Sequence, residues 1–207
     1  MKSDNLAAIM ADSARKLMNQ AVQARREGRL ADANRNWTEA LALCRRSGSR
    51  HDLIVALKGL GQIERDLQNG DAALPLYEEA VALCRAVSGP LLLAHTIGHL
   101  GNIHLDAGRL ELAEPCYDEA LALYRENEQT VPLDLANAIR PLAILQKRNG
   151  DRELAKSLWK LRNSTLQWTC PPQSPKVRDT SLHLVSAYGL SVCCGRTWRP
   201  PGCRDLF

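Results

Sequence analysis

Two histidines, His95 and His99, are the residues whose types and spacing could most directly support chemistry. They are four positions apart, so on a helix both imidazoles would lie on one face, as a pair of zinc ligands does. His104 follows five positions later. No glutamate stands where a zinc hydrolase requires it, and the sequence fixes no third ligand. We therefore predict no metal site and interpret these histidines as groove-lining or surface residues.

The cysteines do not indicate a reaction or a disulfide framework. There are seven, an odd number, and their spacing fits neither paired disulfides nor a zinc finger. Reduced, intracellular cysteines are the simplest interpretation. Nothing resembles a phosphate-binding loop, a nucleophile elbow or a catalytic dyad. The sequence therefore predicts a protein that is not an enzyme and that needs no cofactor.

The elements that must position any functional side chain repeat at intervals of 40 residues. The segment Trp37-Thr38-Glu39-Ala40-Leu41-Ala42-Leu43-Cys44 aligns with residues 77–84 and 117–124. Each unit has the pattern of two amphipathic helices joined by a short break, often at a glycine, with Asn69-Gly70 as the break in the second unit. Such a period predicts a solenoid, in which stacked units bury a core that one unit could not bury alone.

Small residues recur where the two helices of a unit must approach closely. They are Ala21, Gly61, Gly101 and Ala143 in the first helices, and Ala33, Ala73, Ala113 and Ala155 in the second. An aromatic residue follows each of the latter by four positions, at Trp37, Tyr77, Tyr117 and Trp159, and should fill the gap between the helices. A larger residue at a small position should cost roughly 1–3 kcal/mol by overpacking.

This pattern resembles the tetratricopeptide repeat (TPR), which has Leu-Gly in the first helix and Ala, an aromatic residue and Ala in the second. Leu60-Gly61, Ala73, Tyr77 and Ala80 match it, and so do the residues 40 positions later. The unit is longer than the usual ~34 residues and is similar to kinesin-light-chain-like repeats. The resemblance implies an all-α fold, a right-handed α-solenoid of helix-turn-helix repeats, with a non-catalytic role in protein–protein interaction.

The pattern breaks in the fourth unit. Trp159 follows Tyr117 by 42 residues, and Leu161-Arg162 replaces the expected Glu-Ala. We therefore expect a TPR-like solenoid of about four helix pairs in residues 1–160, the fourth incomplete, with its last helix ending near Lys160. Residues 161–207 hold six basic and two acidic residues, the whole net charge of +4, and should form an irregular, poorly ordered tail. Whether this is a native tail, an alternative exon or a changed reading frame stays open.

The first helices should line the concave groove of such a solenoid. The packing pattern leaves the following candidates for peptide binding on their free face: Arg15, Asn19, Lys58, Gln62, Arg65, His95, His99, Asn102, Asn137, Arg140 and Lys147. This basic, amide-rich set suits an extended acidic peptide, because arginine clamps carboxylates and amides hold a peptide backbone. Lys58, Arg65 and Arg140 should supply much of the attraction. Protonation of His99 below about pH 6.5 should strengthen binding.

We predict a cytoplasmic scaffold or adaptor whose partner is a protein or peptide, since no signal peptide or 18-residue apolar stretch indicates a membrane. A chaperone-tail clamp fits poorly, because Gln62, His99 and Pro141 replace residues that such a clamp uses. Three alternatives remain. The basic stripe could be a solvated face, the uncapped C-terminal end could form a homodimer, or the basic tail could bind nucleic acid weakly.

Overall fold

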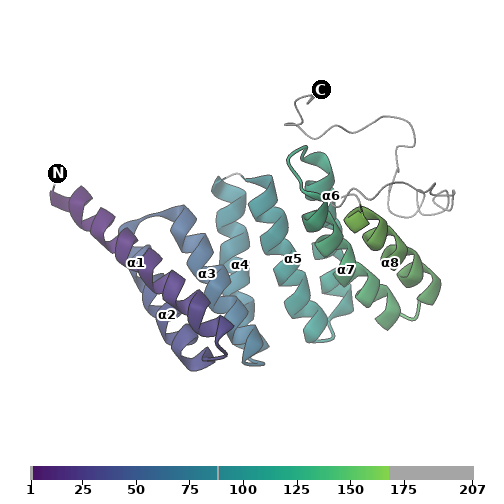
Figure 1. Ribbon diagram of the computed structural model, residues 1–207, viewed down its shortest axis with the longest axis horizontal. Helices are drawn as coiled ribbons and strands as arrows, with labels where there is room; N and C mark the ends of the chain where they lie inside the picture. Colours follow the sequence, from purple (N-terminus) through teal and green to yellow (C-terminus); the bar gives the residue numbers. More distant parts are fainter. Residues whose placement is uncertain (1, 88, 168–207) are drawn as a thin grey trace, which may run out of the picture. The chain divides into compact units, whose positions relative to one another are not determined.

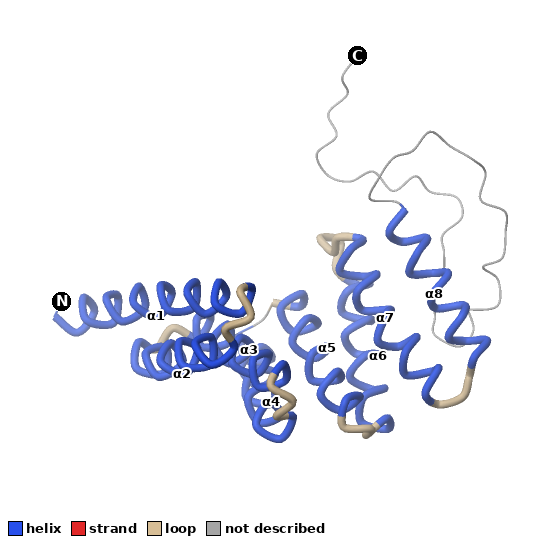
Figure 2. The backbone as a smooth tube through the Cα atoms, turned by 60° about the horizontal axis from the view of Figure 1, so that its bottom comes forward, coloured by secondary structure: helices blue, strands red, loops and turns tan. Residues whose placement is uncertain are grey.

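The computed structural model describes residues 2–87 and 89–167, which form eight helices. They are α1 (Lys2–Arg26), α2 (Leu30–Ser47), α3 (Arg50–Asp66), α4 (Gly70–Val87), α5 (Pro90–Asp106), α6 (Leu110–Glu126), α7 (Pro132–Arg148) and α8 (Arg152–Gln167). Figure 1 shows them following one another in chain order. Within these described ranges there are helices and loops but no strand (Figure 2). The predicted all-α helical repeat is therefore confirmed.

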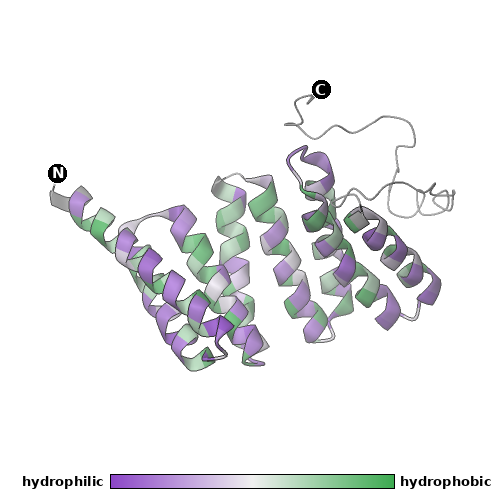
Figure 3. Ribbon diagram, in the orientation of Figure 1, coloured by the Kyte–Doolittle hydropathy of each residue, from purple (hydrophilic) through white to green (hydrophobic). Residues whose placement is uncertain are grey.

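The helices pack as pairs. α1 contacts α2, α3 contacts α4, α5 contacts α6 and α7 contacts α8, and the second helix of each of the first three pairs also packs on the first helix of the next pair. The helices carry both hydrophobic and hydrophilic residues, as Figure 3 shows. Their apolar sides meet in a core of alanine, leucine and isoleucine side chains with the buried aromatics Trp37, Tyr77, Tyr117 and Tyr124.

The turn within each pair contains one residue with a left-handed backbone. Gly28, Gly108 and Gly150 have φ angles of 76°, 73° and 90°, a region that glycine adopts without steric cost. In the second pair, the left-handed residue is Gln68, with φ of 65°. The expected break at Asn69-Gly70 is therefore wrong by one residue, since α4 already begins at Gly70. A residue with a Cβ costs roughly 1 kcal/mol in this conformation.

In the second and third pairs, Tyr77 and Tyr117 of the second helix each lie over a glycine of the first helix. A Cβ added at Gly61 would lie 2.8 Å from Cε2 of Tyr77, and one added at Gly101 would lie 2.7 Å from Cε1 of Tyr117. Both tyrosines are buried, and the Tyr117 hydroxyl donates a hydrogen bond to Oδ1 of Asn102 at 2.9 Å. The predicted close approach at these glycines is confirmed.

The same aromatic positions also join one pair to the next. The indole of Trp37 covers Gly59 of α3, and no Cβ would fit between them. Tyr77 stacks on His99 of α5 with the ring centroids 5.6 Å apart. Each contact joins residues 22 positions apart. The larger ring therefore meets a glycine, and the smaller ring meets an imidazole.

The last described helix differs from the others at its aromatic residue. α8 does not end near Lys160 but continues to Gln167. The guanidinium of Arg162 lies 5.5 Å from the ring centroid of Trp159, which is half-buried. A cation over an exposed aromatic face stabilises by about 0.5–1 kcal/mol. Arg162 thus covers the residue that corresponds to Trp37 and Tyr77. The tail expected beyond this helix, with its cysteines and arginines, lies outside the described residues from position 168 onward.

Two glycines of α5 provide a matched test of the packing. A Cβ at Gly98 would meet no atom within 4 Å, so Gly98→Ala should stabilise the protein by about 0.5–1 kcal/mol through helix propensity. Gly101→Ala should destabilise it by roughly 1–3 kcal/mol, because the new methyl group would contact Tyr117 and lie 3.1 Å from Cβ of Cys116. Urea unfolding followed by circular dichroism measures both changes. Equal midpoints for the two variants would contradict this account of the helix interface.

Candidate functional site

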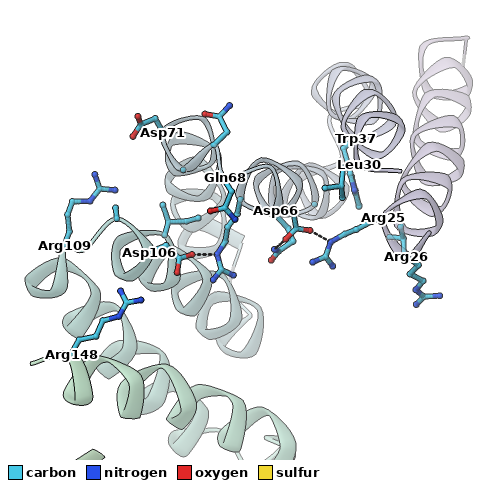
Figure 4. Close-up of a pocket in the computed structure, with 18 residues that line it drawn as sticks. Arg25, Arg26, Leu30, Trp37, Asp66, Gln68, Asp71, Asp106, Arg109 and Arg148 are labelled. Atoms are coloured by element: carbon cyan, nitrogen blue, oxygen red, sulfur yellow. Dashed lines mark hydrogen bonds and ion pairs between the residues drawn. The ribbon is translucent and has the colours of Figure 1, made fainter. Parts of the chain in front are cut away.

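A groove with a volume of about 1220 Å³ lies where the first helices end and turn into the second helices. Figure 4 shows its polar side chains projecting from several helix ends. The last turns of α1, α3, α5 and α7 contribute to it, together with the turns before α4 and α6. It is lined by Val22, Arg25, Arg26, Leu30, Trp37, Gly59, Gln62, Arg65, Asp66, Gln68, Asn69, Gly70, Asp71, Ile103, Asp106, Ala107, Arg109 and Arg148.

Ion pairs between successive first helices hold two of the groove arginines. Nε of Arg25 donates to Oδ2 of Asp66, and Nε of Arg65 donates to Oδ2 of Asp106 at 2.6 Å. Each pair joins residues 41 positions apart, at the same place in successive repeats. These side chains are partly exposed, so each pair contributes only about 0.2–1 kcal/mol to stability. Their main effect is to fix where the guanidinium groups lie.

We call the interface between successive helix pairs a junction. At the third junction, between the third and fourth pairs, the positions of the arginine and its partner are exchanged. With the two extra residues before α7 taken into account, Leu105 stands where Arg25 and Arg65 stand, and Arg148 stands at the aspartate position. Nη1 of Arg148 donates to the backbone carbonyl oxygen of Leu105. A neutral carbonyl thus takes the place of the carboxylate as partner of the arginine, and the positive charge of Arg148 adds to the groove.

Arg109 adds another cation to the same end of the groove. It lies in the turn between α5 and α6, and its Nε donates to Nδ1 of His104 at 3.2 Å. In Figure 4, Arg109 and Arg148 lie near Asp106. Over the whole groove, five arginines face three aspartates, an excess of two positive charges. The lining is therefore suited to an anionic ligand.

The structure gathers only two of the eleven candidate residues, Gln62 and Arg65, in this groove. The others lie outside its lining: Arg15, Asn19, Lys58, His95, His99, Asn102, Asn137, Arg140 and Lys147. Arg15 forms ion pairs with Asp12 and Asp52. The side chain of Asn102 accepts a hydrogen bond from the hydroxyl of Tyr117, so Asn102 supports the helix interface.

Sequence reasoning missed the turn residues that line the groove, among them Gln68, Asp71 and Arg109. The repeat alignment held a signal for them, because Arg109 stands 40 positions after Asn69. Turns at equivalent positions of stacked repeats must lie close to one another, just as the helices do.

His95 and His99 form a separate polar group with Tyr77 and Lys58. Their ring centroids are 4.6 Å apart, and Nδ1 of His99 is buried without a hydrogen-bond partner in the described structure. Burial, followed by His95 and nearby cations, lowers the pKa of His99 to about 3. His95 is more exposed than His99, but packing around its ring, followed by the charge of Lys58, also lowers its pKa, to about 4. The expectation that His99 becomes cationic just below pH 6.5 is therefore wrong.

The histidines do not assemble a metal site with other residues. His104 accepts the hydrogen bond from Arg109 instead of joining the other two. Among the residues that the structure describes, no group of three or more histidine, cysteine, aspartate or glutamate side chains is placed to hold a metal ion. None of the described helices is both long and apolar enough to span a bilayer.

Comparison with known proteins agrees with this architecture. The tetratricopeptide repeat profile matches residues 12–86 and again residues 52–126, which together make up more than half of the chain. The chain belongs to the tetratricopeptide repeat family. The TPR fold is typically non-catalytic, and membership supports a general role as a scaffold for protein–protein interaction. A comparison with curated protein sequences finds no match.

Solved structures resemble this TPR protein in fold. BtubC (BKLC) from P. vanneervenii gives a TM-score of 0.70 at 20% identity, over 82% of this chain and 69% of that one. Apo RapI gives 0.70 at 10% identity, over 77% and 57%. Kinesin light chain-like repeats from Podosopora anserina give 0.50 at 13% identity, over 82% and 98%. At such identities, the likeness establishes the fold alone.

The neutral histidines predict that acid weakens the fold. In the unfolded chain, both imidazoles take up protons below about pH 6.5, whereas the folded protein holds their pKa values near 3 and 4. The unfolded state therefore binds more protons between these values, and the free energy of unfolding should fall as the pH drops from 7 to 5. His99→Gln should reduce this loss by roughly 1 kcal/mol, as measured by urea unfolding at both pH values.

The control for this experiment is His51→Gln, which changes an exposed histidine of α3. It should lose as much stability as the wild type between pH 7 and pH 5. If His99→Gln showed the same loss as the wild type and this control, His99 would not be the buried neutral imidazole that the stack on Tyr77 indicates.

Proposed function

We propose that this TPR protein is a non-catalytic adaptor that binds an extended acidic segment of a partner protein in the arginine-lined groove. The observation that carries this proposal is the excess of arginine over aspartate in the groove lining. Guanidinium groups can donate two parallel hydrogen bonds to a carboxylate. Because successive repeats contribute successive arginines, the groove offers them along a line, as an extended chain requires.

The arginines are already positioned for such a ligand. Arg25 and Arg65 each engage an aspartate through Nε, and their terminal nitrogens retain donors for a further acceptor. A guanidinium that is held in place before binding loses less conformational entropy when a ligand arrives. The amide side chains of Gln62, Gln68 and Asn69 line the same groove and can hydrogen-bond to a peptide backbone.

A direct test uses a fluorescein-labelled decapeptide of alternating glutamate and serine, with a glutamine-serine peptide as its neutral counterpart. Fluorescence anisotropy should show that the acidic peptide binds more tightly than the neutral one. Its affinity should fall as the salt concentration rises, because the charges lie in a solvated groove. In the Arg25→Gln, Arg65→Gln double variant, affinity for the acidic peptide should fall by at least about fivefold, since two charge-assisted contacts are lost.

The matched control is the Arg45→Gln, Arg85→Gln double variant. These arginines also form ion pairs with the next repeat, through Glu79 and Glu119, but they lie outside the groove lining. The control removes the same charge and the same kind of ion pair, so it should bind the acidic peptide like the wild type. An equal loss of affinity in the two double variants would show that overall charge, and not the groove, attracts the peptide.

A further inference from the structure

Three of the five groove arginines gather toward the α7 end of the groove. Near α1, Arg25 pairs with Asp66, and Arg26 lines the groove beside them. Toward α7, three arginines that line the groove, Arg65, Arg109 and Arg148, accompany the single aspartate of the α5 end, Asp106. The formal charge of this group, which we call the arginine cluster, is therefore +2. A lone carboxylate carries only one negative charge, whereas a phosphate monoester carries about −1.5 to −2 near neutral pH.

Each arginine of the cluster is anchored through one nitrogen to a different residue in the last turn of α5. Arg65 is held by Asp106, Arg109 by Nδ1 of His104 and Arg148 by the carbonyl oxygen of Leu105. Each guanidinium has five N–H donors, so most donors of the cluster remain for a ligand. Phosphate has three terminal oxygens that accept strong hydrogen bonds, so it can engage more than one arginine at once.

The repeat alignment shows what is different at this end of the groove. Arg148 stands at the position of Asp66 and Asp106, and Arg109 stands at the position of Asn69. Had the third junction followed the first two, an aspartate would stand in place of Arg148. Each of these two differences adds positive charge to the same end of the groove. The stack itself does not require them, because the earlier junctions are built without them.

We propose that Arg65, Arg109 and Arg148 form a phosphate subsite that receives a phosphorylated side chain of the partner segment. This inference rests on the proposed function and gives it a means of regulation, since phosphorylation of the partner would strengthen binding. A nucleic-acid strand fits the groove less well, because Asp66 and Asp71 also line it. They would repel the continuous row of phosphates that a strand carries.

The experiment compares three labelled decapeptides that differ at one central position of the alternating glutamate-serine sequence: serine, phosphoserine or glutamate. Affinities are measured by anisotropy at constant ionic strength. The phosphoserine peptide should bind about tenfold more tightly than the serine peptide and at least about threefold more tightly than the glutamate peptide, because a dianion meets several charge-assisted donors. In the Arg109→Gln, Arg148→Gln double variant, the advantage of phosphoserine over serine should fall below about twofold.

The control is the Arg152→Gln, Lys156→Gln double variant, which removes two exposed cations of α8 outside the groove lining. It should keep the full advantage of the phosphoserine peptide. Circular dichroism should show unchanged helicity in both double variants.

The outcomes separate this inference from the proposed function. If the acidic serine peptide binds but phosphoserine raises the affinity no more than glutamate does, the phosphate subsite is wrong, and the proposed binding of acidic peptides in the groove stands. If none of the three peptides binds, both proposals fail. If an unlabelled decathymidylate displaces the phosphoserine peptide at a lower concentration than the unlabelled phosphoserine peptide itself does, the cluster serves nucleic acid, which overturns the peptide assignment.

Discussion

The close approach of paired helices is the constraint on which the rest of this structure depends. Tyr77 and Tyr117 occupy the space that side chains at Gly61 and Gly101 would need. Because the helices of each pair are this close, the pairs stack with equivalent residues in equivalent places. Arg25 and Arg65 can then reach the aspartate at the end of the next first helix. The geometry of the groove therefore follows from the packing of the core.

Polar contacts follow the same repeat as the core. Nδ2 of Asn34 donates to Glu64 at 2.6 Å across the first junction, and Nε2 of Gln146 donates to Glu114 at 2.9 Å across the third. These four residues occupy corresponding positions once the two extra residues before α7 are counted. Each contact is between partly buried groups, so its loss would leave a polar atom poorly satisfied. Such hydrogen bonds favour the correct register of neighbouring repeats as well as their association.

The fold could be predicted from the sequence because the packing residues must recur wherever the same two surfaces meet. The turn at Gln68 could not, since a residue with a Cβ replaces the expected glycine there. The residues that line the groove were harder still to predict from the sequence. The partners of Arg65 and Arg148 lie more than 40 positions away, and helical periodicity assigns a face to a residue without showing how far along the groove it lies. His99 was placed on the free face, but its stack on Tyr77 makes it part of the junction.

The aromatic contacts between pairs also determine which repeat can follow which. Trp37 has room because Gly59 lies opposite it, and Tyr77 has His99 opposite it. If the second pair were skipped, or if another copy of the chain supplied the third pair by domain swapping, the indole of Trp37 would meet an imidazole in space it needs itself. Tandem repeats of similar sequence are prone to such misassembly. The unequal sizes of these side chains therefore favour the packing of each repeat on its own neighbour in the chain over packing on another repeat.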